Sequence, residues 1–193
     1  LITNPGNPTG SVLTRAEMRV IADIAVERGL FVISDEVYRE FTYGCEAMAS
    51  MLEFEHAHDN VVVIDSVSKR FSACGARVGA LISRNSGLMK QALKICQARL
   101  CAATLDQVGA AALYSVGPEY FAAVREEYQR RRDTAYAGLM RIPGVVCRRP
   151  EGAFYLMAKL PIDNTDTFQQ WMLEEFSDRG ETVMLTPGEG FYA

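Results

Sequence analysis

The sequence predicts an α/β fold built on a mostly parallel sheet, followed by a smaller α+β domain. Short apolar runs at residues 30–33 and 61–64 are typical of strands that are buried on both faces. A helix with clear capping signals precedes the first run, and strand, helix and strand in this order normally form a parallel pair with a right-handed crossover. Pro143 and Gly144 then break the pattern, and the elements after them differ from those of the first part.

The first helix is predicted by its two ends. Thr14 and Glu17 form a capping box, in which the hydroxyl and the carboxylate satisfy each other's free backbone N–H groups. Apolar residues recur at helical spacing from Met18 onward, and Gly29 closes the helix. Residues 1–3 would form the end of the preceding strand, and we expect a further buried strand at residues 78–82.

Helices dominate the middle of the chain. Apolar residues on one side predict a helix over residues 86–98, and a run rich in small residues predicts another over 105–114. Pro118 stands where a helix can begin, because its missing N–H is not needed there. A long charged helix is expected to run from it to about residue 139.

The last part of the chain is expected to form a separate small unit. Its predicted elements are strands at 145–148 and 154–158, a helix over 167–176 and a strand at 182–185. The predicted organisation is therefore a large domain over residues 1–117, a connecting helix over 118–140 and a small domain over 141–193.

Composition excludes several classes of function. The 193 residues carry 20 Lys and Arg against 24 Asp and Glu, and a domain without a cationic excess is a poor general binder of nucleic acids. The apolar runs are too short to span a membrane. The five cysteines form no dense framework, which indicates reduced thiols and a cytoplasmic protein. His56 and His58 lack an acidic or thiol partner at a useful spacing, so no metal site is predicted.

Polar side chains follow three of the predicted strands, and ligands of open parallel sheets bind beyond the carboxyl ends of the strands. The segment 4–10, Asn-Pro-Gly-Asn-Pro-Thr-Gly, follows the first strand, and Ser-Asp-Glu-Val-Tyr at 34–38 follows the second. Ser-Val-Ser-Lys at 66–69 follows the third, with Arg77 between two glycines further on. Each segment alone is an ordinary turn or cap. Together they indicate a site for an anionic, aromatic ligand that bears a carbonyl group.

In these segments the sequence resembles the class I and II aminotransferases, which are pyridoxal-phosphate (PLP) enzymes of fold type I, and within them the aspartate aminotransferase group. Pro-Glu-Gly-Ala-Phe-Tyr at 150–155 and Pro-Gly-x-x-Phe at 187–191 match the family as well, so the resemblance covers essentially the whole chain in family order. It implies a doubly wound large-domain sheet. It also implies that the chain is the C-terminal half of that domain plus part of the small domain.

The resemblance implies a role for each matching residue. Lys69 would form the Schiff base with PLP and carry the proton between the substrate Cα and the cofactor C4′, work that requires an unprotonated amine. Asp35 would face the pyridine nitrogen and keep it protonated. The remaining contacts would come from Ser66, Ser68 and Arg77 at the phosphate, and from Tyr38 and Asn7 at the phenolic oxygen. Asn7 rather than Asn4 occupies the family position, and Glu36 is given no catalytic role because it points away from Asp35 in an extended chain.

The reaction implied is transfer of an amino group between an amino acid and a 2-oxo acid in a homodimer. Two family features are expected outside this stretch, namely the glycine-rich turn that seats the phosphate and the arginine that binds the substrate α-carboxylate. In one subgroup the partner subunit supplies an arginine for a side-chain carboxylate. That position aligns with Gln97, and Arg99 is offset, so a dicarboxylate substrate is not indicated.

Other functions remain open from the sequence. A lyase, decarboxylase or synthase would use the same PLP site, because the missing residues largely decide which reaction follows. A PLP-binding regulatory module is a third possibility, and the stretch could also be a fragment without catalysis of its own.

Overall fold

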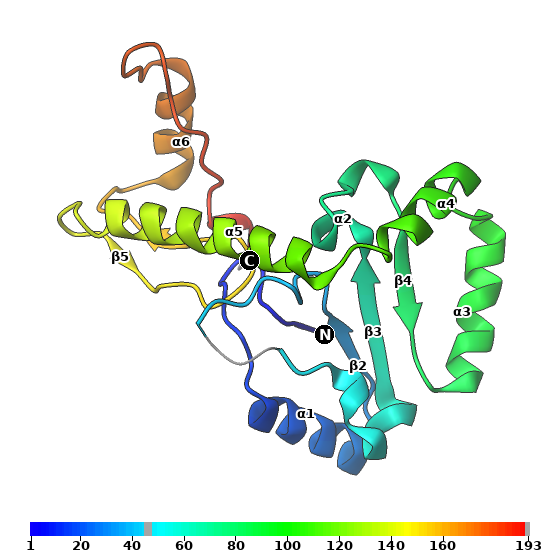
Figure 1. The fold of residues 1–193 in the computed structure, drawn as a ribbon. Helices are drawn as coiled ribbons and strands as arrows, with labels where there is room; N and C mark the ends of the chain where they lie inside the picture. The colour runs from blue at the N-terminus through cyan, green and yellow to red at the C-terminus, as the bar shows by residue number, and fades with distance from the viewer. Residues whose placement is uncertain (45–47, 192–193) are drawn as a thin grey trace.

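The structure is a computed structural model that describes residues 1–44 and 48–191; Cys45 lies outside the described residues. One sheet has the strand order β1-β2-β3-β4 (Figure 1). Its strands are β1 (Ile2–Thr3), β2 (Val32–Asp35), β3 (Val61–Ser66) and β4 (Gly79–Ile82). β1, β2 and β3 are parallel to one another, as the sequence predicts, whereas β4 is antiparallel to β3.

Helix α1 (Arg15–Arg28) has both predicted caps. The Thr14 side chain accepts the Glu17 backbone N–H, and a Glu17 carboxylate oxygen accepts the Thr14 N–H at 2.8 Å. Gly29 ends the helix in the left-handed region at φ 61°, where glycine carries no Cβ penalty. The buried face of α1, with Met18 and Ala22, packs against β2, β3 and residues 51–57 in one apolar core.

Two strands predicted to be buried on both faces are not. In the run 30–33 the side chains alternate, with Val32 buried while Phe31 is 56% and Ile33 41% exposed. All residues of β4 are exposed, and among the described residues this strand pairs only with β3. Burial on both faces requires a layer of other elements on each side of the sheet. In the described part of the chain, such a layer lies mainly on the side of α1.

The next four helices along the chain follow β3; the first, between β3 and β4, was not predicted, and the three after β4 have bounds close to those predicted. They are α2 (Val67–Arg70), α3 (Ser86–Arg99), α4 (Thr104–Leu113) and α5 (Pro118–Leu139). α3 and α4 lie beyond the β4 edge of the sheet, and the long α5 leads back toward the first residues of the chain (Figure 1). No helix in the described part of the chain is long and apolar enough to cross a membrane.

The last part of the chain contains a two-stranded antiparallel sheet of β5 (Val146–Cys147) and β6 (Ala158–Lys159), then α6 (Thr165–Glu174). The predicted strand at 182–185 is wrong. Those residues are irregular, and no described strand lies beside them to complete the hydrogen bonds that a strand requires. The expected domain boundaries near residues 117 and 140 stay a prediction.

Residues 150–153 are joined to the first part of the chain by backbone hydrogen bonds. The N–H groups of Glu151 and Gly152 both donate to the Gly10 carbonyl oxygen at 2.8 Å, and the Ala153 N–H donates to that of Phe41 at 2.9 Å. Gly152 leaves no room for a side chain, since an added Cβ would lie 2.6 Å from Val12 Cγ2 and 2.9 Å from the Phe41 oxygen. The glycine therefore lets this segment approach the loops at the sheet edge.

Candidate active site

The parallel register brings three strand ends to one edge of the sheet. Thr3 lies opposite Asp35, and Asp35 lies opposite Ile64. Backbone hydrogen bonds from Asn4 N–H to the Asp35 oxygen (3.0 Å) and from Glu36 N–H to the Ile64 oxygen (2.9 Å) continue this register beyond the strands. The three polar segments found in the sequence thus leave the sheet side by side, as the strand-end rule predicts.

Lys69 projects from α2 toward a group of aromatic rings. Its Nζ lies 5.9 Å from the centre of the Tyr38 ring and 5.6 Å from that of Phe154, a cation–π geometry. Among the described residues the amine has no ion pair and no hydrogen bond, so the rings are its main contacts. An amine held in this way keeps its nitrogen lone pair available for chemistry once it has lost its proton.

Tyr38 is buried beneath the amine, and its hydroxyl is hydrogen-bonded to the hydroxyl of Tyr155. Burial raises the pKa of the Tyr38 phenol, and Tyr155 and the nearby Asp35 carboxylate raise it further. The phenol therefore keeps its proton at neutral pH and can donate a hydrogen bond. Sequence reasoning assigned no role to Phe154 and Tyr155, although the motif that contains them was the available signal.

Ser66 and Ser68 lie together where β3 passes into α2. Their hydroxyl oxygens are 2.8 Å apart, and Ser66 Oγ accepts the Ser68 N–H at 3.1 Å. Arg77 lies just before β4, whose Gly79 is opposite Ser66. Its side chain is exposed, and the guanidinium donates to the Cys74 carbonyl oxygen at 2.9 Å. The structure thus brings the two serines together and places Arg77 on the adjoining segment.

The two asparagines of the first loop have different environments. Asn4 is fully buried, and its amide oxygen accepts the Leu13 N–H at 2.9 Å, so this side chain holds the loop. Asn7 is exposed at the same edge of the sheet. Asp35, half-buried, accepts the Val37 N–H at 3.2 Å with one carboxylate oxygen.

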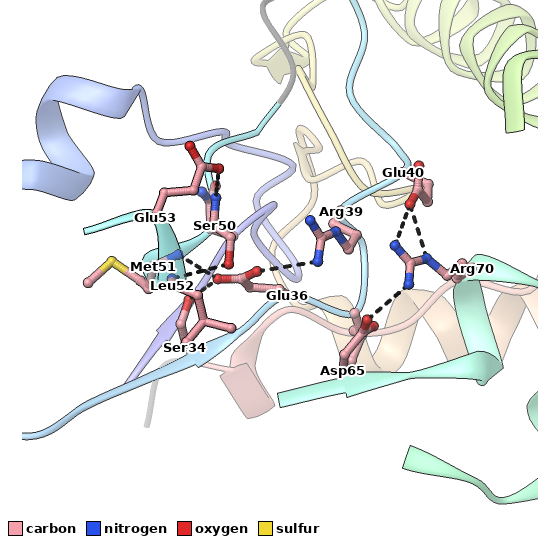
Figure 2. Close-up of polar contacts among 12 residues, drawn as sticks. Ser34, Glu36, Arg39, Glu40, Ser50, Met51, Leu52, Glu53, Asp65 and Arg70 are labelled. Atoms are coloured by element: carbon pink, nitrogen blue, oxygen red, sulfur yellow. Dashed lines mark hydrogen bonds and ion pairs between the residues drawn. The ribbon is translucent and has the colours of Figure 1, made fainter. Parts of the chain in front are cut away.

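Glu36 points into the protein, away from Asp35, as the extended chain predicts. Figure 2 shows its carboxylate between Ser34, the Met51 backbone and Arg39. One oxygen accepts the Ser34 hydroxyl at 3.2 Å and the Met51 N–H at 2.9 Å, whereas Oε2 has no hydrogen-bond partner and lies 3.9 Å from the Arg39 guanidinium. Burial raises the pKa of this carboxyl, although its hydrogen bonds and Arg39 oppose the shift.

A second charged cluster, shown in Figure 2, surrounds Arg70. Its Nε and Nη2 donate to Glu40 Oε1 at 3.0 and 2.7 Å, and its Nη1 donates to Asp65 Oδ2 at 3.2 Å. Sequence reasoning missed this cluster. The available signal was Asp65, a carboxylate that ends the otherwise apolar run 61–64 and is buried.

The chemistry of this edge fits PLP. A phosphate needs hydroxyl and guanidinium donors, and Ser66, Ser68 and Arg77 carry them. A phenolic oxygen needs a protonated donor, and the phenol of Tyr38 is one. A ring nitrogen that stays protonated needs a carboxylate, and Asp35 carries one. The amine of Lys69 stands free beside them. Among the described residues no group of three or more His, Cys, Asp and Glu side chains could hold a metal ion.

Comparisons with known proteins show which family the chain resembles. The family model "Aminotransferase class I and II" matches residues 1–192. The chain is 31% identical to the aspartate aminotransferase of Bacillus subtilis strain 168, over 99% of this chain and 49% of that protein. It is 33% identical to the probable aspartate/prephenate aminotransferase of Aquifex aeolicus, over 100% of this chain and 50% of that protein.

A solved structure shares the fold as well. The crystal structure of the aspartate aminotransferase from Thermotoga maritima superposes with a TM-score of 0.82 at 30% identity, covering 98% of this chain and 48% of that one. The chain thus spans about half the length of the relatives and structures that it matches.

Proposed function

Because the chain belongs to the class I and II aminotransferase family, we propose that its protein transfers an amino group between an amino acid and a 2-oxo acid with PLP as cofactor. The observation that carries the proposal is the free amine of Lys69 above the buried phenol of Tyr38, at the edge that also holds Asp35 and the two serines. That edge combines a nucleophile with the donors and acceptors that PLP requires.

The residues that would hold the cofactor fall into three groups. Ser66, Ser68 and Arg77 would bind the phosphate. Tyr38 and Asn7 would donate hydrogen bonds to the phenolic oxygen. Asp35 would face the ring nitrogen and hold a proton on it; the bound cofactor then supplies an electron sink for negative charge that develops on the substrate.

Lys69 would act twice. Its amine would first hold the cofactor covalently, and after the substrate has displaced it the same amine would move a proton between the substrate Cα and the cofactor C4′. The rings of Tyr38 and Phe154 would restrict the movement of this side chain at the edge of the sheet. Restricting a catalytic group in this way removes much of the entropic barrier to proton transfer.

We further propose a common L-amino acid as the substrate, since relatives of this chain are named for aspartate and for aromatic amino acids. A homodimer is proposed from the exposed apolar side chains of α3 and α4, such as Ile95, Leu105 and Val108. The cytoplasm is proposed as the location because the four described cysteines are free thiols, which persist in a reducing compartment.

The experiment that tests the function is chemical labelling of the cofactor lysine. The full-length protein, loaded with PLP and reduced with borohydride, is expected to carry a pyridoxyl group on Lys69 and to transaminate before reduction. A Lys69→Ala variant treated in the same way is the control and is expected to carry no specific label. Label on Lys90 or Lys94 of α3 instead would contradict the assignment.

A further inference from the structure

Arg70, the residue after Lys69, joins three segments of the candidate site. Its guanidinium is hydrogen-bonded to Glu40, two residues beyond Tyr38, and to Asp65 at the end of β3. The other oxygen of Asp65 accepts the Ser66 backbone N–H at 2.7 Å. One side chain therefore connects the segment of Tyr38, the serine turn and the helix that carries Lys69 (Figure 2).

The cluster is well shielded from water. The side chains of Arg70 and Asp65 are 15% and 9% exposed, and the guanidinium also lies over the rings of Phe71 and Tyr114 at 5.8 and 6.0 Å. Burial opposes the charge of the guanidinium, but the hydrogen bond to Glu40 and the charges of Asp65 and Glu40 outweigh it and raise the pKa of Arg70. Ion pairs shielded in this way are screened far less by salt than exposed ones.

Helix α2 needs such an anchor because it has only four residues. A single turn is not stable on its own, since fixing its backbone yields very few hydrogen bonds. Consecutive residues of a helix point about 100° apart, so Lys69 and Arg70 can reach different surroundings. Lys69 faces the rings of Tyr38 and Phe154, while Arg70 faces Glu40 and Asp65.

We propose that Arg70 is a positioning residue for the reaction: its bonds to Glu40 and Asp65 hold α2 so that the amine of Lys69 stays above Tyr38. The inference rests on the proposed function, because it assigns Arg70 a task in placing the reacting amine. Lysine is not an equivalent substitute, because an ammonium group lacks the planar fork that reaches both carboxylates.

The test compares Arg70→Met and Arg70→Lys with the wild type in the full-length, PLP-loaded protein. A displacement of the amine by about 1 Å lowers the rate on the order of 10²-fold, so kcat is expected to fall by about this factor in Arg70→Met while KM for the amino acid changes little. Arg70→Lys is expected to recover only part of the loss. The pH midpoint of the absorbance change of bound PLP is expected to move in both variants, because it reports the surroundings of the Lys69 nitrogen.

Arg130→Met is the matched control. Arg130 forms an exposed ion pair with Glu127 on α5, and its loss is expected to leave both readouts unchanged. If Arg70→Met does not fold, Glu40→Gln removes the charge of one partner and is expected to shift kcat and the spectral midpoint in the same direction, to a smaller degree.

Three outcomes would overturn the inference. A variant that melts at a lower temperature but keeps the wild-type kcat and spectral midpoint per molecule of bound PLP would make Arg70 a purely structural residue. If the wild type transaminates and Arg70→Met does so at the same rate, the inference about Arg70 would be wrong while the proposed function would stand. If the wild-type protein does not form a covalent bond between Lys69 and PLP, both the inference about Arg70 and the proposed function would be wrong.

Discussion

Two carboxylates stand side by side at the end of β2, and their surroundings differ. Asp35 is half-buried at the sheet edge, next to Tyr38 and the first loop. Glu36 is fully buried on the opposite side and binds the Ser34 hydroxyl and the Met51 backbone. The alternation of side chains in extended backbone separates the two, which leaves only Asp35 in a position to serve a ligand at the edge.

Asp35→Ala is expected to retain PLP but to lose most of its turnover. The bond to Lys69 and the phosphate contacts would remain, whereas the ring nitrogen would lose the carboxylate that holds its proton. Loss of one group that stabilises developing charge lowers kcat on the order of 10²-fold or more. The measurement is the rate of transamination at saturating PLP, with PLP content determined on the same sample. Activity within a few-fold of the wild type would mean that Asp35 does not face the ring.

The sequence predicts well which polar segments meet at the site when they directly follow strands. Strands are recognised from local patterns, and the carboxyl ends of parallel strands meet at one edge of the sheet. The segments of Asn7, Asp35 and Lys69 were located in this way, and the family resemblance selected these residues within them. The parallel register places the segments side by side. The contact of Lys69 with Phe154 joins positions 85 residues apart in the sequence. No local pattern encodes such a distance, so the aromatic group around the amine and the Arg70 cluster appear only in the folded chain.

At the scale of elements, the ends of helices are predicted best, because capping side chains, glycine and proline mark them in the sequence. The box of Thr14 and Glu17 and the glycine at position 29 fix α1 within a few residues, and Pro118 marks the start of α5. Strands are predicted less well, because a strand exists only with a neighbour that supplies hydrogen bonds. Residues 182–185 have suitable side chains but no such neighbour among the described residues.

Glu36 connects β2 to the turn η1 (Met51–Glu53) through its bond to the Met51 N–H, and this link is expected to depend on pH. Burial raises the pKa of Glu36 in the folded protein above the ordinary value of 4.5. Below that value the carboxyl is neutral in both the folded and the unfolded protein, so it does not make stability depend on pH. As pH rises, the unfolded chain ionises first, so stability falls until pH has passed the raised pKa, and the loss persists above it.

Glu36→Gln is neutral at every pH and is therefore expected to gain stability relative to the wild type as pH rises above 4.5. The measurement is the midpoint of thermal unfolding of both proteins between about pH 4 and 7, the interval in which a carboxyl with a raised pKa titrates. Glu17→Gln is the control with the opposite sign, because bonds to Thr14 lower the pKa of Glu17 below 4.5. Its charge contributes stability that is fully present above 4.5 and is lost as pH falls through the lowered pKa. A difference between Glu36→Gln and the wild type that does not change with pH would contradict the prediction.

At the scale of the molecule, the described chain exposes many large apolar side chains, among them a group on the sheet and a group on α3 and α4. Phe31 and Ile33 of the first run lie exposed on the sheet, and Ile95 and Leu105 are exposed on α3 and α4, the latter at 86%. Where such side chains adjoin one another on the surface, they mark contact sites in soluble proteins. A chain that spans about half the length of its relatives has two sources of such contacts, the rest of its own protein and a second copy.

The last prediction is that the complete protein works as a homodimer and that residues 1–193 alone are inactive. α3 and α4 carry more apolar residues than a helix with one buried face needs, and in the structure many of them face solvent, so they are expected to pack against a second copy. The fragment is expected to lack the groups that orient the substrate carboxylate, and orientation supplies much of the rate.

Light scattering and a transamination assay on the full-length protein and on the 1–193 fragment test both parts. We expect a dimer with activity in the first case and no transamination in the second. Leu105→Glu in α4 is a sharper probe of the dimer, because a charge buried in an apolar interface without a partner strongly disfavours association. Val20→Glu serves as the control, since Val20 is exposed on α1, which lies away from both helices (Figure 1). A fully active monomer would refute the first part of the prediction, because the exposed surface of α3 and α4 would then not be needed for the site. A fragment that transaminates efficiently would refute the second part, because the groups that orient the substrate would then lie within residues 1–193.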